Sequence, residues 1–243
     1  MKQGKKILTM QDQSDKITAL RSRLKLAAAE AQRPASEVTL LAVSKTRTPE
    51  QVKHAVDCGL TSFGENYLQE ALKKVSALKA LALDWHFIGP IQSNKTRQIA
   101  ENFAWVHSID RLKIAQRLSA QRPVTMLPLN ICLQVNIDNE PTKAGFGSSE
   151  LLQLIAEIAR LPNLKLRGLM AIPEARKDLQ EQRRPFHQLR KLKDEINQSL
   201  DNSQKLDTLS MGMSADLEAA ILEGATIVRV GTDIFGPRNA TAG

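Results

Sequence analysis

A lysine ends one of the apolar runs of this sequence, where its amine could react. Residues Thr39–Lys45 have the composition of a strand, and the alternation of strand side chains puts Leu41, Val43 and Lys45 on one face. Partial burial at such a position favours the neutral amine, which is the form that condenses with aldehydes into Schiff bases. A lysine at a strand end can also extend its charged group into solvent. Position alone leaves both interpretations open.

An arginine interrupts the last apolar run, Ile227–Val230. Alternation puts Arg229 on the same face as Gly231, which follows the run. Burying a guanidinium group without a partner costs several kcal/mol, so we expect an acceptor for Arg229 inside the fold. That acceptor is either the partner in a structural salt bridge or an atom of a ligand.

The residues that follow the last two predicted strands could bind a phosphate. Gly231 allows a close approach of the backbone, and Thr232 adds a hydroxyl. Ser214 precedes a predicted helix, Ala215–Leu222, and is a good N-cap residue. Backbone N–H groups at this helix start and near Gly231 could surround an anion. We therefore predict a phosphate site that faces Lys45, although capping alone would also explain Ser214.

These residues need a scaffold that brings them together. The predicted strands are Thr39–Lys45, Ser62–Glu65, Trp85–Ile88, Trp105–Ser108, Leu129–Ile137, Leu166–Ile172, Thr208–Met211 and Ile227–Val230. The predicted helices are Ile17–Ala31, Pro49–Cys58, Leu68–Ala77, Ser93–Ala100, Arg111–Ala120, Ser149–Arg160, Pro185–Leu200 and Ala215–Leu222. Their alternation predicts a single α/β domain, a (β/α)8 TIM-like barrel with an extra N-terminal helix, whose functional residues lie at the strand ends. An open, doubly wound sheet is the structural alternative.

Composition excludes several classes of protein. The chain has 243 residues, 42% hydrophobic and 25% charged, as expected for one ordinary globular domain. Its formal charge of +8 comes from dispersed lysines and arginines, which favours a solvated surface over a nucleic-acid interface. No apolar stretch is long enough to span a membrane, and Met1–Met10 lacks the features of a signal peptide. The cysteines Cys58 and Cys132 form no CxxC pair, so we expect a reducing cytoplasm.

Six segments, in unbroken order, resemble those of the pyridoxal phosphate homeostasis proteins. They are Leu40–Lys45, Phe63–Tyr67, Trp85–Lys95, Arg167–Pro173, Leu209–Ser214 and Val228–Gly236. The resemblance implies a barrel like the N-terminal domain of alanine racemase. We accordingly expect a flexible N-terminal segment at residues 1–13, a cofactor-binding barrel at 14–238 and a C-terminal tail at 239–243.

The resemblance also implies a set of cofactor-binding residues. They are Lys45 as the Schiff-base lysine of pyridoxal 5′-phosphate, Arg229 at the pyridine nitrogen, Ser214, Gly231 and Thr232 at the phosphate, and Asn66 and Met211 beside the ring. A cation at the pyridine nitrogen disfavours its protonation and so weakens the ring as an electron sink.

Four other residues of these segments and their neighbours have no settled role. His86 and Lys95 belong either to helix-start chemistry or to an accessory ligand site. Lys143 is either a surface lysine or a second acceptor of the aldehyde. Arg47 stands where many family members have lysine, and an arginine cannot form an imine.

Two functions remain in competition. The first is homeostasis of vitamin B6, in which the protein holds the reactive aldehyde and passes it to apo-enzymes. The second is an amino-acid racemase of the alanine racemase type, which implies a second, β-rich domain with a catalytic tyrosine. Because the chain ends soon after the last predicted strand and Tyr67 is its only tyrosine, we expect no enzyme and no catalytic residue. We also expect no metal site, since the histidines are scattered, and a cytoplasmic monomer that binds neither nucleic acid nor membrane.

Overall fold

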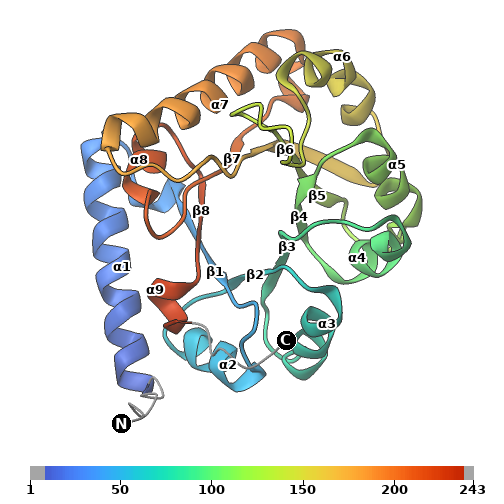
Figure 1. Ribbon diagram of the computed structural model, residues 1–243. Coiled ribbons are helices and arrows are strands. Elements are labelled where there is room, and N and C mark those ends of the chain that lie inside the picture. Colours follow the sequence, from blue (N-terminus) through green and yellow to red (C-terminus); the bar gives the residue numbers. More distant parts are fainter. Residues whose placement is uncertain (1–8, 238–243) are drawn as a thin grey trace.

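The computed structural model describes residues 9–237, which form a closed barrel of eight parallel strands (Figure 1). The strands are β1 (Thr39–Val43), β2 (Ser62–Glu65), β3 (Asp84–Phe87), β4 (Trp105–Ile109), β5 (Leu129–Gln134), β6 (Leu164–Met170), β7 (Thr208–Ser210) and β8 (Ile227–Val230). Each strand pairs with the next, and β8 pairs with β1. The predicted (β/α)8 barrel is therefore confirmed, and the open sheet is excluded.

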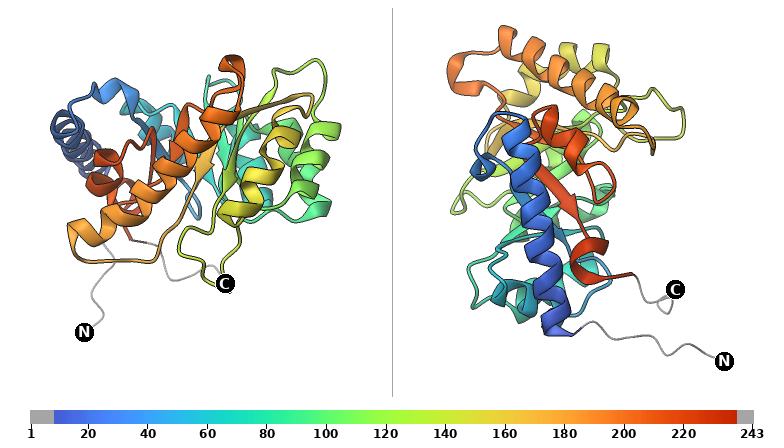
Figure 2. Two further views of the ribbon diagram at one scale, coloured as in Figure 1. Left: turned by 90° about the horizontal axis from the view of Figure 1, so that it is seen from above. Right: turned by 90° about the vertical axis from the view of Figure 1, so that its left-hand side faces the viewer.

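Helices surround the barrel on its outer side (Figure 1). The α-helices are α1 (Met10–Glu30), α2 (Pro49–Asp57), α3 (Leu68–Ala77), α4 (Thr96–Asn102), α5 (Leu112–Gln121), α6 (Ser148–Ala159), α7 (Leu179–Ser199), α8 (Leu217–Leu222) and α9 (Thr232–Phe235). Short 3-10 helices span Ala35–Glu37, Ser93–Lys95 and Asn202–Gln204. The extra helix α1 packs against α8 and α9, as both views of Figure 2 agree. It thus lies beside the elements that follow β7 and β8.

The side chains between the barrel and the helices differ in polarity from those inside the barrel. The layer between barrel and helices is mainly aliphatic, as the aromatic content of 4% requires. Inside the barrel, by contrast, polar side chains of β3, β4, β7 and β8 bond to one another in a chain. Since β4 and β7 are not neighbours in the sheet, these side chains must meet in the barrel interior. The polar interior is the first structural sign of a binding site.

Local capping moves the ends of three helices away from their predicted positions. α1 begins at Met10 rather than Ile17, because Thr9 and Asp12 form a capping box, so residues 10–13 are helical and not part of the predicted flexible segment. α7 begins at Leu179, because the Asp178 side chain accepts two backbone N–H groups. Pro185, the predicted start of that helix, lies inside it. Residues 1–8 and the predicted tail 239–243 lie outside the described residues.

The third helix bears on the predicted phosphate site. α8 begins at Leu217 with Asp216 in the N-cap position, so the predicted capping role of Ser214 is wrong. Several strands also end early. β1 ends at Val43 and β5 at Gln134, short of the predicted Lys45 and Ile137. The short helix α9, after β8, was not predicted.

Candidate functional site

Lys45 follows β1 at the barrel mouth, between two residues whose backbones are fixed. Ser44 is fully buried, and its hydroxyl donates a hydrogen bond to the Glu65 carboxylate at 2.6 Å. Thr46 has a φ of 63°, and its N–H donates to Glu70 at 2.6 Å. Because the Ser44 side chain points outward to α3, alternation turns Lys45 toward the barrel interior. The Lys45 side chain is half-buried there.

A buried ion cluster supports this segment from behind, between β2 and α3. Lys74 of α3 is 2% exposed and donates to the Ser44 carbonyl at 2.6 Å and to the Glu65 carboxylate at 2.7 Å. Its third partner is Glu70. Burial raises the pKa of Glu65, against the opposite effect of Lys74. The two carboxylates compensate the Lys74 charge, and the cluster fixes the backbone on both sides of Lys45.

Arg229 lies inside the barrel and is 5% exposed. Its Nη1 donates to the carbonyl and the hydroxyl of Ser210 at 2.6 and 2.8 Å, and its Nη2 donates to the Ala171 carbonyl at 2.9 Å. All three acceptors are neutral, and no carboxylate within residues 9–237 forms a salt bridge with it. Burial lowers the pKa of Arg229 to about 10, against the opposing effect of Asp216. The expected interior acceptor is present, but the structural salt bridge is not.

Ser210 connects Arg229 to two buried histidines. Its hydroxyl lies 2.7 Å from His107 Nδ1, and His107 Nε2 lies 2.9 Å from His86 Nδ1. Since Arg229 can only donate, we assign the Ser210 hydroxyl as its acceptor and as the donor to His107, which in turn donates to His86. Burial lowers the pKa of His86 to about 3 and that of His107 well below its usual value. Arg229 thus lies at one end of a chain of neutral groups, formed by Ser210, His107 and His86.

The segments after β7 and β8 end close to β1. Gly231 continues the β1–β8 register, and a Cβ there would lie 3.3 Å from the Val43 carbonyl, so a side chain would crowd β1. Ser214 is half-buried and Thr232 is exposed. Neither hydroxyl forms a hydrogen bond within the described part of the chain. Arg23 of α1 contacts both segments. The predicted phosphate residues are therefore brought together, with two hydroxyls available.

Asn66 and Met211, the predicted ring neighbours, differ in their surroundings. Asn66 follows β2, and its Oδ1 is buried without a hydrogen-bond partner among residues 9–237. A Cβ at Gly89 would lie 2.1 Å from the Asn66 carbonyl, so only glycine lets the loop after β3 pack here. Met211 is fully buried within the hydrophobic core. The structure leaves one acceptor of Asn66 unused, whereas a place for Met211 beside the ring stays a prediction.

The chain matches known proteins over almost its whole length. The model of the family "Alanine racemase, N-terminal domain" matches residues 16–239. The pyridoxal phosphate homeostasis protein of Pseudomonas aeruginosa is 55% identical over 226 residues, which are 93% of this chain and 96% of that protein. The homeostasis protein of Escherichia coli K12 is 46% identical over 95% of this chain and 98% of its own length. This chain belongs to the pyridoxal phosphate homeostasis protein family.

Solved structures agree with that family. PipY of Synechococcus elongatus PCC7942, solved with pyridoxal phosphate bound, is 36% identical, with a TM-score of 0.81 over 92% of this chain and 100% of PipY. The structure of PipY without the cofactor is 37% identical to this chain, with a TM-score of 0.82. Alanine racemase of Clostridium difficile is 14% identical, with a TM-score of 0.71, and shares the fold; this chain covers 58% of it. The homeostasis proteins and the racemases thus have one barrel architecture in common.

The structure places the four residues whose role in a pyridoxal phosphate homeostasis protein was left open by the sequence. His86 belongs to the interior chain and not to a helix start. Lys95 is half-buried in the 3-10 helix after β3. Lys143 forms an ion pair with Glu140. Arg47 donates at 2.6 Å to the carbonyl of Gly236 and so holds the segment after α9.

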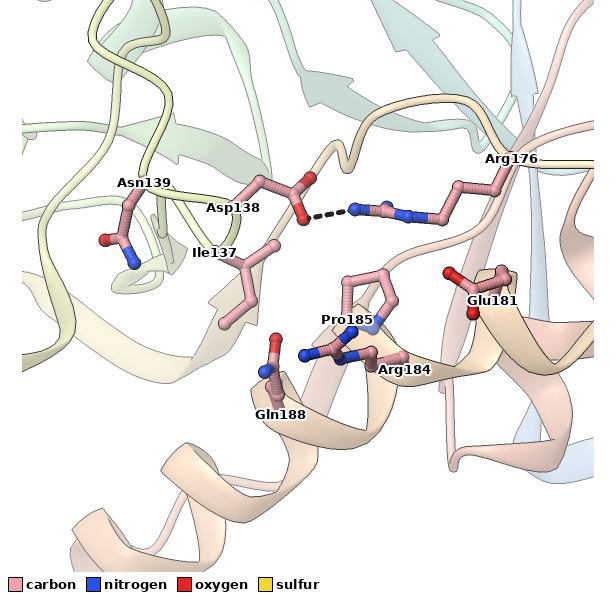
Figure 3. Close-up of a pocket in the computed structure, with 8 residues that line it drawn as sticks. All are labelled: Ile137, Asp138, Asn139, Arg176, Glu181, Arg184, Pro185 and Gln188. Carbon is pink, nitrogen blue, oxygen red and sulfur yellow. Dashed lines mark hydrogen bonds and ion pairs between the residues drawn. The ribbon is translucent and has the colours of Figure 1, made fainter.

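Two surface hollows lie elsewhere. The larger one, about 300 Å³, lies between the loop after β5 and the start of α7 (Figure 3). An ion pair between Arg176 and Asp138 at 2.8 Å crosses its wall. The smaller one, about 220 Å³, includes Lys143. None of the predicted cofactor-binding residues lines either hollow, so we assign no ligand to them.

The described residues give no indication of two other kinds of site. No helix among them is long and apolar enough to cross a membrane. They contain no group of three or more histidine, cysteine, aspartate or glutamate residues placed to hold a metal ion.

The groups that position the site could hardly be recognised from the sequence. Glu70 and Lys74 have the i, i+4 spacing of a helix ion pair, but the spacing does not reveal that Glu65 joins them. Arg23 lies beside the apolar stripe of α1 and has no recognisable pattern. His107 could have been found from strand alternation, which places it on the inward side of β4.

Proposed function

We propose that this protein serves pyridoxal 5′-phosphate homeostasis by holding the cofactor as a Schiff base on Lys45. One observation carries the proposal. Two hydrogen bonds, from Lys74 to the Ser44 carbonyl and from the Thr46 N–H to Glu70, fix the backbone on both sides of Lys45. Lys45 therefore lies at the mouth of a barrel whose interior presents a cation, Arg229, without a salt bridge among the described residues. An anchor for a reactive aldehyde needs such a fixed amine beside polar groups that orient the ligand.

Other polar groups fit the same ligand. Arg229 would face the pyridine nitrogen, because its charge is not compensated by a carboxylate in direct contact. Asn66 offers an unused buried acceptor. The hydroxyls of Ser214 and Thr232 would bind the phosphate, and Gly231 lets the backbone approach it closely.

The chemistry is a condensation. Bound pyridoxal phosphate would supply the aldehyde, and the Lys45 amine would form the carbon–nitrogen bond, with the carbonyl oxygen of the aldehyde released as one water molecule. No oxidant or reductant is needed. Release reverses the step by hydrolysis or by transfer to another amine.

Arg229 favours storage over catalysis. A cation at the pyridine nitrogen opposes its protonation, which weakens the ring as an electron sink for amino-acid chemistry. We therefore propose a carrier with at most a weak side activity, and not a racemase. That the relatives at 45–55% identity are named homeostasis proteins supports this view.

The cellular setting is part of the proposal. We propose a cytoplasmic monomer that binds neither nucleic acid nor membrane and transfers the cofactor transiently to apo-enzymes. Mixing the loaded protein with an apo-enzyme that depends on pyridoxal phosphate tests transfer, if activity returns faster than spontaneous release of the cofactor allows.

Two measurements test the function. The purified protein, loaded with pyridoxal phosphate, should show Schiff-base absorbance that is lost in Lys45→Ala. A wild type that cannot be loaded would refute the proposal. Chiral analysis after incubation with L-alanine separates carrier from enzyme: turnover of about 1 per second or faster would favour a racemase.

A further inference from the structure

Arg23 of the extra helix α1 bonds to both segments that contain the predicted phosphate-binding residues. Its Nη2 donates to the Ser214 carbonyl at 3.0 Å, in the segment after β7. Its Nη1 donates to the Asp233 carboxylate at 3.0 Å, in α9 after β8. Its Nε and Nη2 donate to the two oxygens of Glu218, at 2.8 and 3.0 Å. One planar guanidinium group thus bridges three acceptors, which a lysine ammonium could not do with the same geometry.

The charges around these segments make such a bridge necessary. Glu218 and Asp233 lie close to the residues that would receive a phosphate, a group with roughly two negative charges. Burial raises the pKa of Glu218, but the hydrogen bonds from Arg23, a backbone hydrogen bond and the charge of Arg23 together outweigh this effect and leave that pKa lowered. Without the ion pairs to Arg23, the carboxylates of Glu218 and Asp233 would place uncompensated negative charge beside the phosphate and repel it.

We propose that Arg23 is a positioning residue for the phosphate of the cofactor: it holds the segments after β7 and β8 together and compensates their carboxylates. The inference rests on the proposed function, since it concerns the same ligand. It gives α1 a role beyond packing. Through Arg23, the extra helix sets the selectivity of the barrel for the phosphorylated form of the vitamin.

Comparison of two ligands isolates this role. Pyridoxal has the ring and the aldehyde of pyridoxal phosphate but lacks the phosphate, so absorbance titrations with both ligands separate the phosphate contribution from everything else. We expect Arg23→Met to weaken pyridoxal phosphate binding by about tenfold or more, and pyridoxal binding by less than about threefold. Arg23→Lys keeps the charge but not the three-way bridge, and should give an intermediate loss for pyridoxal phosphate alone.

The chain offers a matched control on the same helix. Arg21 also donates from Nη2 to a backbone carbonyl, that of Gly59, at 2.8 Å, and lies away from Ser214 and Asp233. Arg21→Met should leave the ratio of the two affinities unchanged. An equal loss for both ligands in Arg23→Met, no loss at all, or the same change of ratio in Arg21→Met would each overturn the inference.

Binding of the two ligands by the wild type distinguishes failure of this inference from failure of the proposed function. If the wild type binds neither ligand, the proposed function fails. If it binds both with equal affinity, the phosphate site and the role of Arg23 fail while the Schiff base stands. Should Arg23→Met not fold, as judged by thermal unfolding, Arg23→Lys carries the test with the same two titrations.

Discussion

Two polar networks flank the end of β1, and they differ in how they treat a buried cation. Behind the strand, Lys74 bonds to the carboxylates of Glu65 and Glu70. Inside the barrel, Arg229 bonds to neutral acceptors of Ser210 and Ala171. The first cation is compensated by carboxylates, whereas the second bonds to neutral groups and forms no salt bridge within residues 9–237.

This difference distinguishes a cation that stabilises the fold from a cation that is available to bind a ligand. A compensated cation stabilises the backbone that it touches, and removing it exposes its partners. A cation among dipoles costs free energy in the empty protein, and a ligand can recover that cost. Substitutions of the first kind should therefore reduce stability, and substitutions of the second kind should mainly reduce binding.

The largest expected effect is on the ion cluster. Lys74→Met leaves Glu65 buried without its partner, which should lower the free energy of unfolding by about 3–5 kcal/mol. Urea unfolding followed by circular dichroism measures it. The double variant Glu65→Gln/Lys74→Met removes both charges and should recover most of the loss; a double variant as unstable as Lys74→Met would show that packing, and not charge, is responsible.

A smaller stability effect is expected inside the barrel. Arg229→Gln retains a donor for Ser210 and should change the free energy of unfolding by about 2 kcal/mol or less. Pyridoxal phosphate affinity should nevertheless fall by about tenfold or more, because the cation that we propose to face the ring is lost. Titration of the folded variant checks this, with Lys191→Gln, an exposed surface substitution, as control. Unchanged affinity would contradict a ligand-directed role for Arg229.

A more gradual effect concerns pH. The pKa of His86 falls from 6.5 to about 3 on folding, so its contribution to stability is complete above pH 6.5 and is lost as the pH falls toward 3. Unfolding measured between pH 7 and pH 4 should therefore show a loss of roughly 1 kcal/mol per pH unit for each buried neutral histidine. His86→Asn should have a shallower pH dependence than the wild type. Equal slopes would mean that His86 is not neutral inside the fold.

Much of this architecture could be predicted from the sequence, because strand and helix periodicity is a local signal. All eight strands were located, and Arg229 was correctly expected to find an acceptor inside the fold. The hydrogen bond from Lys74 to the Ser44 carbonyl could not be predicted, because the two residues are 30 positions apart and come together only in the folded barrel. Of the two roles considered for Ser214, capping is wrong: a serine before a helical pattern is a strong local signal, but α8 begins two residues later, with Asp216 in the N-cap position.

The central claim is that Lys45, and no other lysine, anchors the cofactor. Borohydride reduction of the loaded protein, followed by proteolysis and mass spectrometry, tests it most directly, because reduction makes the bond permanent wherever it has formed. We predict that the added mass lies on the peptide that contains Lys45 and that Lys45→Arg carries none. Label on Lys74, Lys95 or Lys143 in place of Lys45, or no label on the wild type, would contradict the account.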